Sequence, residues 1–420
     1  MTAAAASGRA FRVRLVAAAC LAGMISLLLR SSLGVLGPDL MRDFAIGPEA
    51  LGLLAGVFFI TFAALQLPLG ILLDRLGPRR VVAGGLAVAA LGCALFVVAP
   101  DFRALLIGRV VMGAGCAALM IGGFVLLSRW FAAAEYARAS SFLVAFGNSG
   151  TLLATAPLGL AAVWLGWRGA FAVIGVAAAV IVVLVLVFQR DAPPGHALHG
   201  RETESLTDSL RGIVEVLRNR RMPYLLSMAL VGYPVIAAVL ALWGGPYLND
   251  VHGLDTVARS NVMLGMAVAV MAAPLFWGAL VRVIGLRRTV LAGAGTCFVA
   301  LSSLAAFPAP DLWLAAVLLL LLGGSGGYAM LLLAIAREIF PDHLTGRAMT
   351  IVNVAVVGGV SVMQIATGFV VGAFPLTEAG LAPPDAYRTL FAVLAAAVTT
   401  GALVFRRMPP LPGEAGDESG

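Results

Sequence analysis

The chain has 420 residues, of which 61% are hydrophobic and only 12% charged, and its mean hydropathy is +1.01. A soluble protein of this length needs far more polar surface, so the composition excludes an ordinary soluble domain and indicates a membrane protein. The net charge of +7 does not indicate a nucleic-acid-binding protein, because most of the 28 basic residues, all arginine, lie in the loops of one side.

Twelve apolar segments of about 20 residues, the length that crosses a hydrocarbon layer ~30 Å thick, follow one another along the chain. They are too long and alternate too little to be strands, so we expect an all-α membrane protein. With both termini in the cytoplasm, 21 arginines fall in cytoplasmic segments and five in outer loops. This fits the usual excess of positive charge on the cytoplasmic side of membrane proteins. The predicted spans are 13–36, 51–72, 81–99, 104–128, 139–164, 169–188, 222–247, 260–281, 289–307, 312–336, 348–373 and 389–405.

The first predicted span contains an arginine, Arg30, eight residues before Pro38 in the segment SLLLRSSLGVLGPDL. A charge at this depth costs ~3 kcal/mol on insertion scales, so such residues usually face a cavity and have a function. Arg109 interrupts the fourth span nine residues after Pro100. At ~1.5 Å per residue, both guanidinium groups lie ~12–14 Å below the outer boundary of the membrane.

Acidic residues are absent from the predicted spans except near their ends. Two arginines without an acidic neighbour inside the membrane favour an anionic ligand, because a guanidinium group binds carboxylate or phosphate through paired hydrogen bonds. Alternatives remain open. Arg30 can extend toward the membrane–water interface or form a pair that only stabilises the fold. Arg109 can bond to backbone carbonyls or relay protons.

The second predicted span ends in GILLDRLGPRR (70–80), and a similar segment, GALVRVIGLRR (278–288), follows 208 positions later. A shift that also aligns Pro100 with Pro308 and Arg129 with Arg337 indicates an internal repeat of six helices. The predicted organisation is an N-terminal tail 1–12, a six-helix bundle 13–188, a cytoplasmic linker 189–221, a second bundle 222–405 and a C-terminal tail 406–420.

Six residues of the 70–80 segment match the signature between helices 2 and 3 of the major facilitator superfamily, namely Gly70, Asp74, Arg75, Gly77, Arg79 and Arg80. RVVMGAG (109–115) and the spacing of residues 353–368 resemble that superfamily's helices 4 and 11. The resemblance covers nearly the whole chain. It implies two pseudo-symmetric six-helix bundles and transport by alternating access.

The resemblance also implies that the 70–80 segment acts in gating. Gly77 permits the turn, Gly70 permits close helix approach, and Asp74 accepts hydrogen bonds near residues 345–347 of helix 11. A segment that only anchors the topology is the alternative. In the second copy Arg282 replaces the aspartate, so that copy is expected to be mostly an anchor.

The spacing Arg–x7–Pro–x–Leu around Arg30 resembles the anion:cation symporters and the organophosphate:phosphate antiporters, in which the equivalent arginine meets the anion. Arg30 and Arg109 are therefore the predicted substrate-binding residues. Polar and aromatic residues inside the spans are weaker cavity candidates, for which hydrogen bonding between helices is the alternative. They are Gln66, Asn148, Tyr233, Trp243, Tyr328, Asn353 and Gln364.

These observations predict a monomeric transporter of the cytoplasmic (inner) membrane, with both termini in the cytoplasm. Its substrate is expected to be a small organic anion such as a carboxylate, and its transport to be coupled to a proton or another ion. An efflux pump for a drug, a siderophore or another metabolite is the alternative, and a receptor on the same fold is less consistent with a gating segment. No nucleophile–base pair, cofactor motif or metal cluster appears in the sequence, so an enzyme is not expected.

Overall fold

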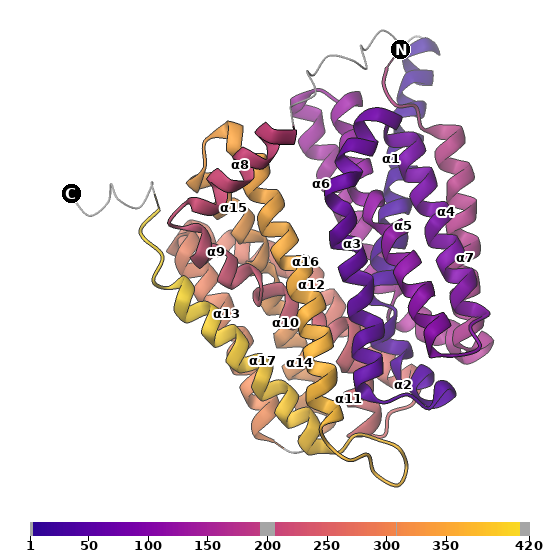
Figure 1. Ribbon diagram of the computed structural model, residues 1–420, viewed down its shortest axis with the longest axis vertical. Coiled ribbons are helices and arrows are strands. Elements are labelled where there is room, and N and C mark those ends of the chain that lie inside the picture. The colour runs from indigo at the N-terminus through magenta and orange to yellow at the C-terminus, as the bar shows by residue number, and fades with distance from the viewer. Residues whose placement is uncertain (1–2, 194–205, 308, 412–420) are drawn as a thin grey trace. The chain divides into compact units, whose positions relative to one another are not determined.

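The computed structural model describes residues 3–193, 206–307 and 309–411, which form helices and connecting turns with no strand among them (Figure 1). In chain order the helices are α1 (Ala3–Ser31), α2 (Leu33–Phe44), α3 (Pro48–Leu76), α4 (Pro78–Val97), α5 (Phe102–Trp130), α6 (Ala133–Leu153), α7 (Ala156–Phe188), α8 (Leu206–Arg218), α9 (Met222–Ala229), α10 (Gly232–Ala238), η1 (Val239–Trp243), α11 (Gly244–Asp250), α12 (Thr256–Ile284), α13 (Leu286–Ala306), α14 (Leu312–Ser325), η2 (Gly326–Met330), α15 (Leu331–Ile339), α16 (Asp342–Gly372) and α17 (Pro384–Phe405).

Eleven stretches of helix in the described chain are long and apolar enough to cross a membrane, so the chain is a multi-pass membrane protein. The predicted all-α fold is confirmed. Twelve spans were predicted, and the helix missing from these eleven is α6, which carries Glu135 and Arg138. The helix α7 that follows contains a non-helical residue, Gly166, with φ 69° and ψ 169°. The predicted span 139–164 thus corresponds to α6 with the first turns of α7, and the span 169–188 to the remainder of α7.

Three predicted spans are interrupted. The first breaks at Ser32, between α1 and α2, where the Ser32 hydroxyl donates to the carbonyl of Leu29 at 2.9 Å. The span 222–247 is divided into α9, α10, the π-helix η1 and α11, and the span 312–336 contains the 3₁₀-helix η2. Interrupted helices inside membranes occur where backbone groups find other partners, and they commonly form binding sites.

The described chain divides into two compact units. The first comprises Met1–Ile46, Val57–Gly200 and Thr256–Asn261, and the second comprises Gly47–Gly56, Arg201–Asp255 and Val262–Gly420. Two long helices are therefore shared, because the first turns of α3 group with the second unit and the first turns of α12 with the first. The predicted domain boundaries stay a prediction, and residues 194–205 of the predicted linker and 412–420 of the C-terminal tail lie outside the described residues.

The first unit is built on close packing of α4 against α5 and α7, which run side by side in Figure 1. A side chain at Gly92 of α4 would lie 2.6 Å from the backbone nitrogen of Met112 on α5, so only glycine permits this approach. Small residues at helix contacts are the usual means of packing in a membrane, where apolar burial gives little net gain. Nearby, the rings of Phe96 and Phe171 lie 4.5 Å apart and join α4 to α7.

The 208-residue repeat is visible in the backbone at two turns. Gly77 precedes α4 with φ 80° and ψ 155°, and Gly285 precedes α13 with φ 81° and ψ 163°. Positive φ of this kind is readily adopted only by glycine. The turn that the sequence repeats is therefore the same turn in both copies.

Candidate functional site

Arg30 lies in the last turn of α1, and its guanidinium group faces aromatic rings of α3. The guanidinium carbon is 4.6 Å from the ring centre of Phe62 and 5.6 Å from that of Phe59. Contacts between a cation and an aromatic face stabilise by ~0.5–2 kcal/mol, and by more where water is excluded. The side chain of Arg30 thus turns toward α3, inside the first unit.

Arg109 is fully buried on α5 and reaches the same turn of α1. Its Nη1 donates to the carbonyl of Leu29 at 3.0 Å, and its guanidinium carbon lies 4.7 Å from the ring centre of Phe58. The last four carbonyls of a helix have no partner within it, and Leu29 is one of them because α1 ends at Ser31. Arg109 therefore satisfies the backbone at the helix break, which is one of the alternatives that the sequence left open for it.

The structure brings both predicted substrate-binding arginines to one place. We call this group the arginine–phenylalanine cluster, and it consists of Arg30, Arg109, Phe58, Phe59 and Phe62. Sequence reasoning missed the three rings, although their run FFITF (58–62) places them within little more than one turn of α3. The cluster joins two cations to apolar rings, an environment in which an anion would be attracted strongly.

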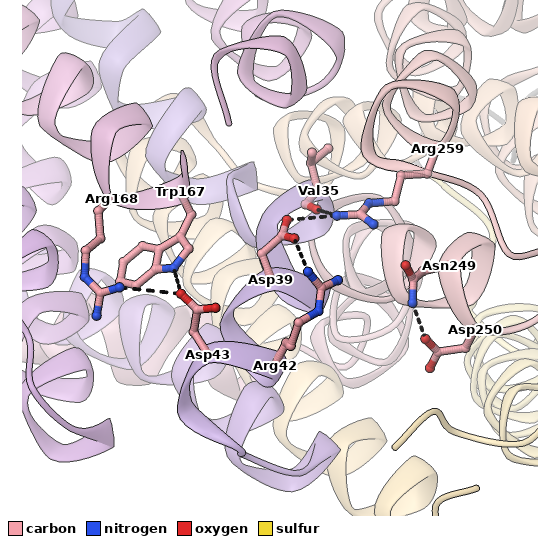
Figure 2. Close-up of polar contacts among 9 residues, drawn as sticks. All are labelled: Val35, Asp39, Arg42, Asp43, Trp167, Arg168, Asn249, Asp250 and Arg259. Atoms are coloured by element: carbon pink, nitrogen blue, oxygen red, sulfur yellow. Dashed lines mark hydrogen bonds and ion pairs between the residues drawn. The ribbon is translucent and has the colours of Figure 1, made fainter. Parts of the chain in front are cut away.

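A second group of charges lies on α2, at the other end of the helix break, and is drawn in Figure 2. The Asp39 carboxylate lies 2.9 Å from Nη2 of Arg259 and 3.7 Å from Nη1 of Arg42. Arg259 is almost fully buried and also donates to the carbonyl of Val35 at 3.4 Å. Arg259 is one of the five arginines expected in outer loops, and the structure places it in the first turn of α12. No local pattern signals this pair, because its members are 220 residues apart.

The neighbouring acid on α2 contacts α7. Asp43 accepts a hydrogen bond of 2.6 Å from Nε1 of Trp167 and lies 3.5 Å from Nη1 of Arg168 (Figure 2). The Arg168 guanidinium carbon lies 4.2 Å from the ring centre of Trp167. These contacts fix α2 on α7.

The acid that contacts the predicted gating segment is Asp191, which lies outside it and which sequence reasoning did not single out. Asp191 accepts a hydrogen bond of 2.8 Å from the backbone N–H of Arg79, in the first turn of α4, where a negative charge is favoured. The Arg79 guanidinium donates to the carbonyl of Leu186. Asp74 is exposed, and its carboxylate has no hydrogen bond or ion pair among the described residues.

The other members of the segment are placed as follows. Arg75 and Arg80 are exposed, and a side chain added at Gly70 would meet nothing within 4 Å. The close helix approach expected at Gly70 stays a prediction. The gating role of these six residues stays a prediction.

Two of the weaker candidates lie in one part of the second unit. Trp243 and Gln364 are both fully buried there, and Trp243 donates to Thr367, which is on the same helix as Gln364. Gln66 is buried on α3, Tyr328 is buried on η2, Asn148 and Tyr233 are half-buried, and Asn353 is exposed.

Within the described ranges, no group of three or more His, Cys, Asp or Glu side chains is placed to hold a metal ion. The four cysteines, which are all described, are buried and unpaired with one another.

The chain is similar to known membrane transporters. The family model of the Major Facilitator Superfamily matches residues 19–330 and 262–420. A probable L-galactonate transporter of Escherichia coli (strain K12) is 32% identical over 155 residues, which are 37% of this chain and 34% of that protein. The hexuronate transporter of the same strain is 23% identical over 419 residues, covering 94% of this chain and 93% of that protein.

A solved structure shows the same fold. The crystal structure of a bacterial homolog of the human lysosomal transporter Spinster matches with a TM-score of 0.77 over 96% of this chain and 99% of that one, at 16% identity. A likeness at this identity is evidence of fold alone. The matched family model, which covers most of the sequence, is evidence of descent, and the chain belongs to the major facilitator superfamily, a family of transporters and not of enzymes.

Proposed function

We propose that the protein is a secondary transporter that moves a small organic anion, a carboxylate, across the cytoplasmic membrane by alternating access. Both termini lie in the cytoplasm, the protein acts as a monomer, and transport is coupled to a proton or another ion. The observation that carries the proposal is the arginine–phenylalanine cluster. It holds the guanidinium group of Arg30 against Phe62 and Phe59 at the break between α1 and α2.

The two arginines have different parts in this proposal. Arg109 is committed to the carbonyl of Leu29, so it holds α1 in place and adds positive potential. Arg30 is half-buried, and its guanidinium group carries five N–H donors in the planar arrangement that binds a carboxylate through paired hydrogen bonds. Arg30 is therefore the substrate-binding residue, and Arg109 positions it.

Two relatives give support of a separate kind. The names of the L-galactonate transporter and of the hexuronate transporter both refer to carboxylates, and the second match spans nearly the whole of both chains. A positive site formed by Arg30 is what a carboxylate requires. The predicted gating residues of the 70–80 segment belong to the same proposal, because alternating access needs a switch on the cytoplasmic side.

The first test replaces Arg30. The Arg30→Ala protein in liposomes should lose uptake of labelled glucuronate by at least ~100-fold, because one charge-assisted pair in a dry site is worth ~3 kcal/mol or more. Arg42→Ala is the matched control, because Arg42 lies on the next helix with 70% of its side chain exposed, and it should keep wild-type uptake. Wild-type uptake by the Arg30→Ala protein would refute the anion site.

The efflux alternative is separated by ligand binding. Thermal shifts of the purified protein should be large with carboxylates and absent with hydrophobic cations. Stabilisation by hydrophobic cations that survives Arg30→Ala would favour an exporter of drugs or metabolites instead.

A further inference from the structure

Aromatic rings mark one end of the first unit, where α5 and α7 finish beside the start of the first membrane-crossing stretch. The stretches long and apolar enough to cross a membrane begin at Phe11 on α1 and end at Trp130 on α5 and at Phe188 on α7. The rings of Phe11 and Trp130 lie 5.1 Å apart, and Trp130 Nε1 donates to the carbonyl of Arg190 at 2.7 Å. Tryptophan is enriched at the level of lipid headgroups, so Trp130 places this end of the unit at a membrane surface.

Two exposed arginines cross between α1 and the end of α7 at this surface. The guanidinium carbon of Arg14, on α1, lies 5.6 Å from the ring centre of Phe188 on α7. That of Arg190, which follows α7, lies 5.4 Å from the ring centre of Phe11 on α1. A cation is attracted to the face of an aromatic ring, so each contact holds an otherwise flexible side chain. Two cations are therefore held together on neighbouring helices.

These two cations are not balanced by an acid of the described chain. Neither Arg14 nor Arg190 forms an ion pair with another described residue. The elements that meet here carry two acids at this end, and both have other partners. Glu135 of α6 lies 3.4 Å from Arg12, and the Asp191 carboxylate accepts a hydrogen bond of 2.8 Å from the backbone at the start of α4. Two like charges repel each other, and an anion bound between them removes that cost.

The surface of α7 that leads away from Arg190 is apolar. Val187, Val183, Val180 and Val176 are each more than half exposed. They recur every three or four residues, so they lie along one face of the helix. An exposed apolar face of this kind is suited to contact with lipid chains. A pair of cations at the end of such a face matches a phospholipid, which joins an anionic phosphate to apolar chains, better than it matches a small soluble anion.

We propose that Arg14 and Arg190 bind the phosphate of an anionic phospholipid, whose chains lie along the exposed valines of α7. The site prefers a headgroup of net negative charge to a zwitterionic one, because the positive part of a zwitterionic headgroup is repelled by the arginines. In the proposed topology this is the cytoplasmic leaflet, where anionic lipids attract basic groups beside membrane spans. The inference goes beyond the proposed function, because no residue of the arginine–phenylalanine cluster takes part in it.

The experiment titrates the purified full-length protein, in an uncharged detergent, with short-chain phosphatidylglycerol and with phosphatidylcholine of the same chains. The wild-type protein should bind phosphatidylglycerol at least ~10-fold more tightly, the change expected for two arginines beside an anionic headgroup. Arg14→Gln combined with Arg190→Gln should abolish this preference, because an amide forms no charge-assisted hydrogen bond with phosphate. Glycerophosphoglycerol, the same headgroup without chains, should bind at least ~10-fold more weakly than the lipid, because it buries no apolar surface.

The matched control is Arg282→Gln combined with Arg288→Gln. Both arginines are exposed, flank the second copy of the repeated turn and belong to the same side in the proposed topology. The control removes the same charge from the chain, so it should keep the wild-type preference for phosphatidylglycerol. If it weakens binding as much as the replacement of Arg14 and Arg190 does, the lipid responds to the overall charge of the protein and the site is overturned.

The titrations of the wild-type protein decide the remaining outcomes, so the test does not depend on the folding of a variant. Equal affinity for the two lipids would overturn the proposal. Glycerophosphoglycerol that binds as tightly as phosphatidylglycerol would also overturn it, because the occupant would then be a soluble anion. A preference for phosphatidylglycerol that is present in the wild-type and control proteins, and absent once Arg14 and Arg190 are replaced, supports the lipid site.

Discussion

Buried arginines in this protein are held by backbone carbonyls as much as by acids. Arg109 donates to Leu29 at the end of α1, and Arg259 donates to Val35 on α2 in addition to its ion pair with Asp39. Both guanidinium groups thus secure the two sides of one helix break. A buried cation with such partners is a structural element of the membrane fold, and its presence alone does not mark a binding site.

The ion pair of Arg259 gives a prediction about stability. Asp39→Asn removes a charge that lies 2.9 Å from an arginine whose side chain is only 2% exposed. Leaving a buried charge without its partner costs ~3–5 kcal/mol, less here because Asp39 is partly exposed. The melting temperature in detergent should fall by several degrees.

The control for this change is Asp385→Asn. The pair of Asp385 with Arg388 is 3.0 Å long, but its side chains are 67% and 41% exposed. An exposed pair contributes ~0–1 kcal/mol, so the melting temperature should hardly move. If both substitutions lower the melting temperature equally, the buried pair of Asp39 and Arg259 stabilises the fold no more than an exposed pair does.

At the scale of helices and turns, the two halves share a backbone but differ in what surrounds it. Gly77 and Gly285 have the same positive φ, yet a side chain at Gly77 would collide with the carboxylate of Asp191, while one at Gly285 would meet nothing within 4 Å. The first copy of the turn packs against this acid, whereas the second keeps an arginine hydrogen bond, from Arg287 to the carbonyl of Arg406, and has open space at its glycine.

This difference predicts unequal effects of the same substitution. Gly285→Ala should cost only the strain of positive φ, ~1–2 kcal/mol. Gly77→Ala should cost more, because Asp191 must also leave its hydrogen bond with the backbone of Arg79. Melting temperatures of the two variants, measured side by side, test this order, and a larger loss for Gly285→Ala would contradict it.

The sequence predicts features of this fold that depend on local pattern. The apolar spans, the repeat and the turn glycines follow from residues that lie close together in the chain. The helix breaks at Ser32 and at Val239–Trp243, by contrast, depend on tertiary partners such as Arg109 and Thr367. Arg30 and Arg109 were found because charge inside a span is rare, whereas Phe58, Asp191 and Arg259 look ordinary in sequence and gain their roles only through distant contacts.

For the molecule as a whole, the central question is whether the 70–80 segment is a switch or an anchor. Two acids in or near this segment, Asp191 and Asp74, differ in their contacts. Asp191 bonds to the first turn of α4, whereas Asp74 is exposed and its carboxylate has no partner among the described residues. An exposed acid without contacts contributes little to stability, so any function it has must arise in another state of the transport cycle.

Asp74→Asn and Asp191→Asn should therefore affect different measurements. Asp74→Asn should leave the melting temperature and the substrate affinity unchanged and slow turnover about 5- to 150-fold, the range that a coupling of 1–3 kcal/mol produces. Asp191→Asn should lower stability by ~0.3–1 kcal/mol, through the lost charge at the start of α4, and leave turnover near wild type. Uptake rates at saturating substrate, together with binding and melting of the same preparations, distinguish the two. If turnover of the Asp74→Asn protein is unchanged, the segment is an anchor, because a carboxylate that neither stabilises the fold nor sets the rate has no part in gating.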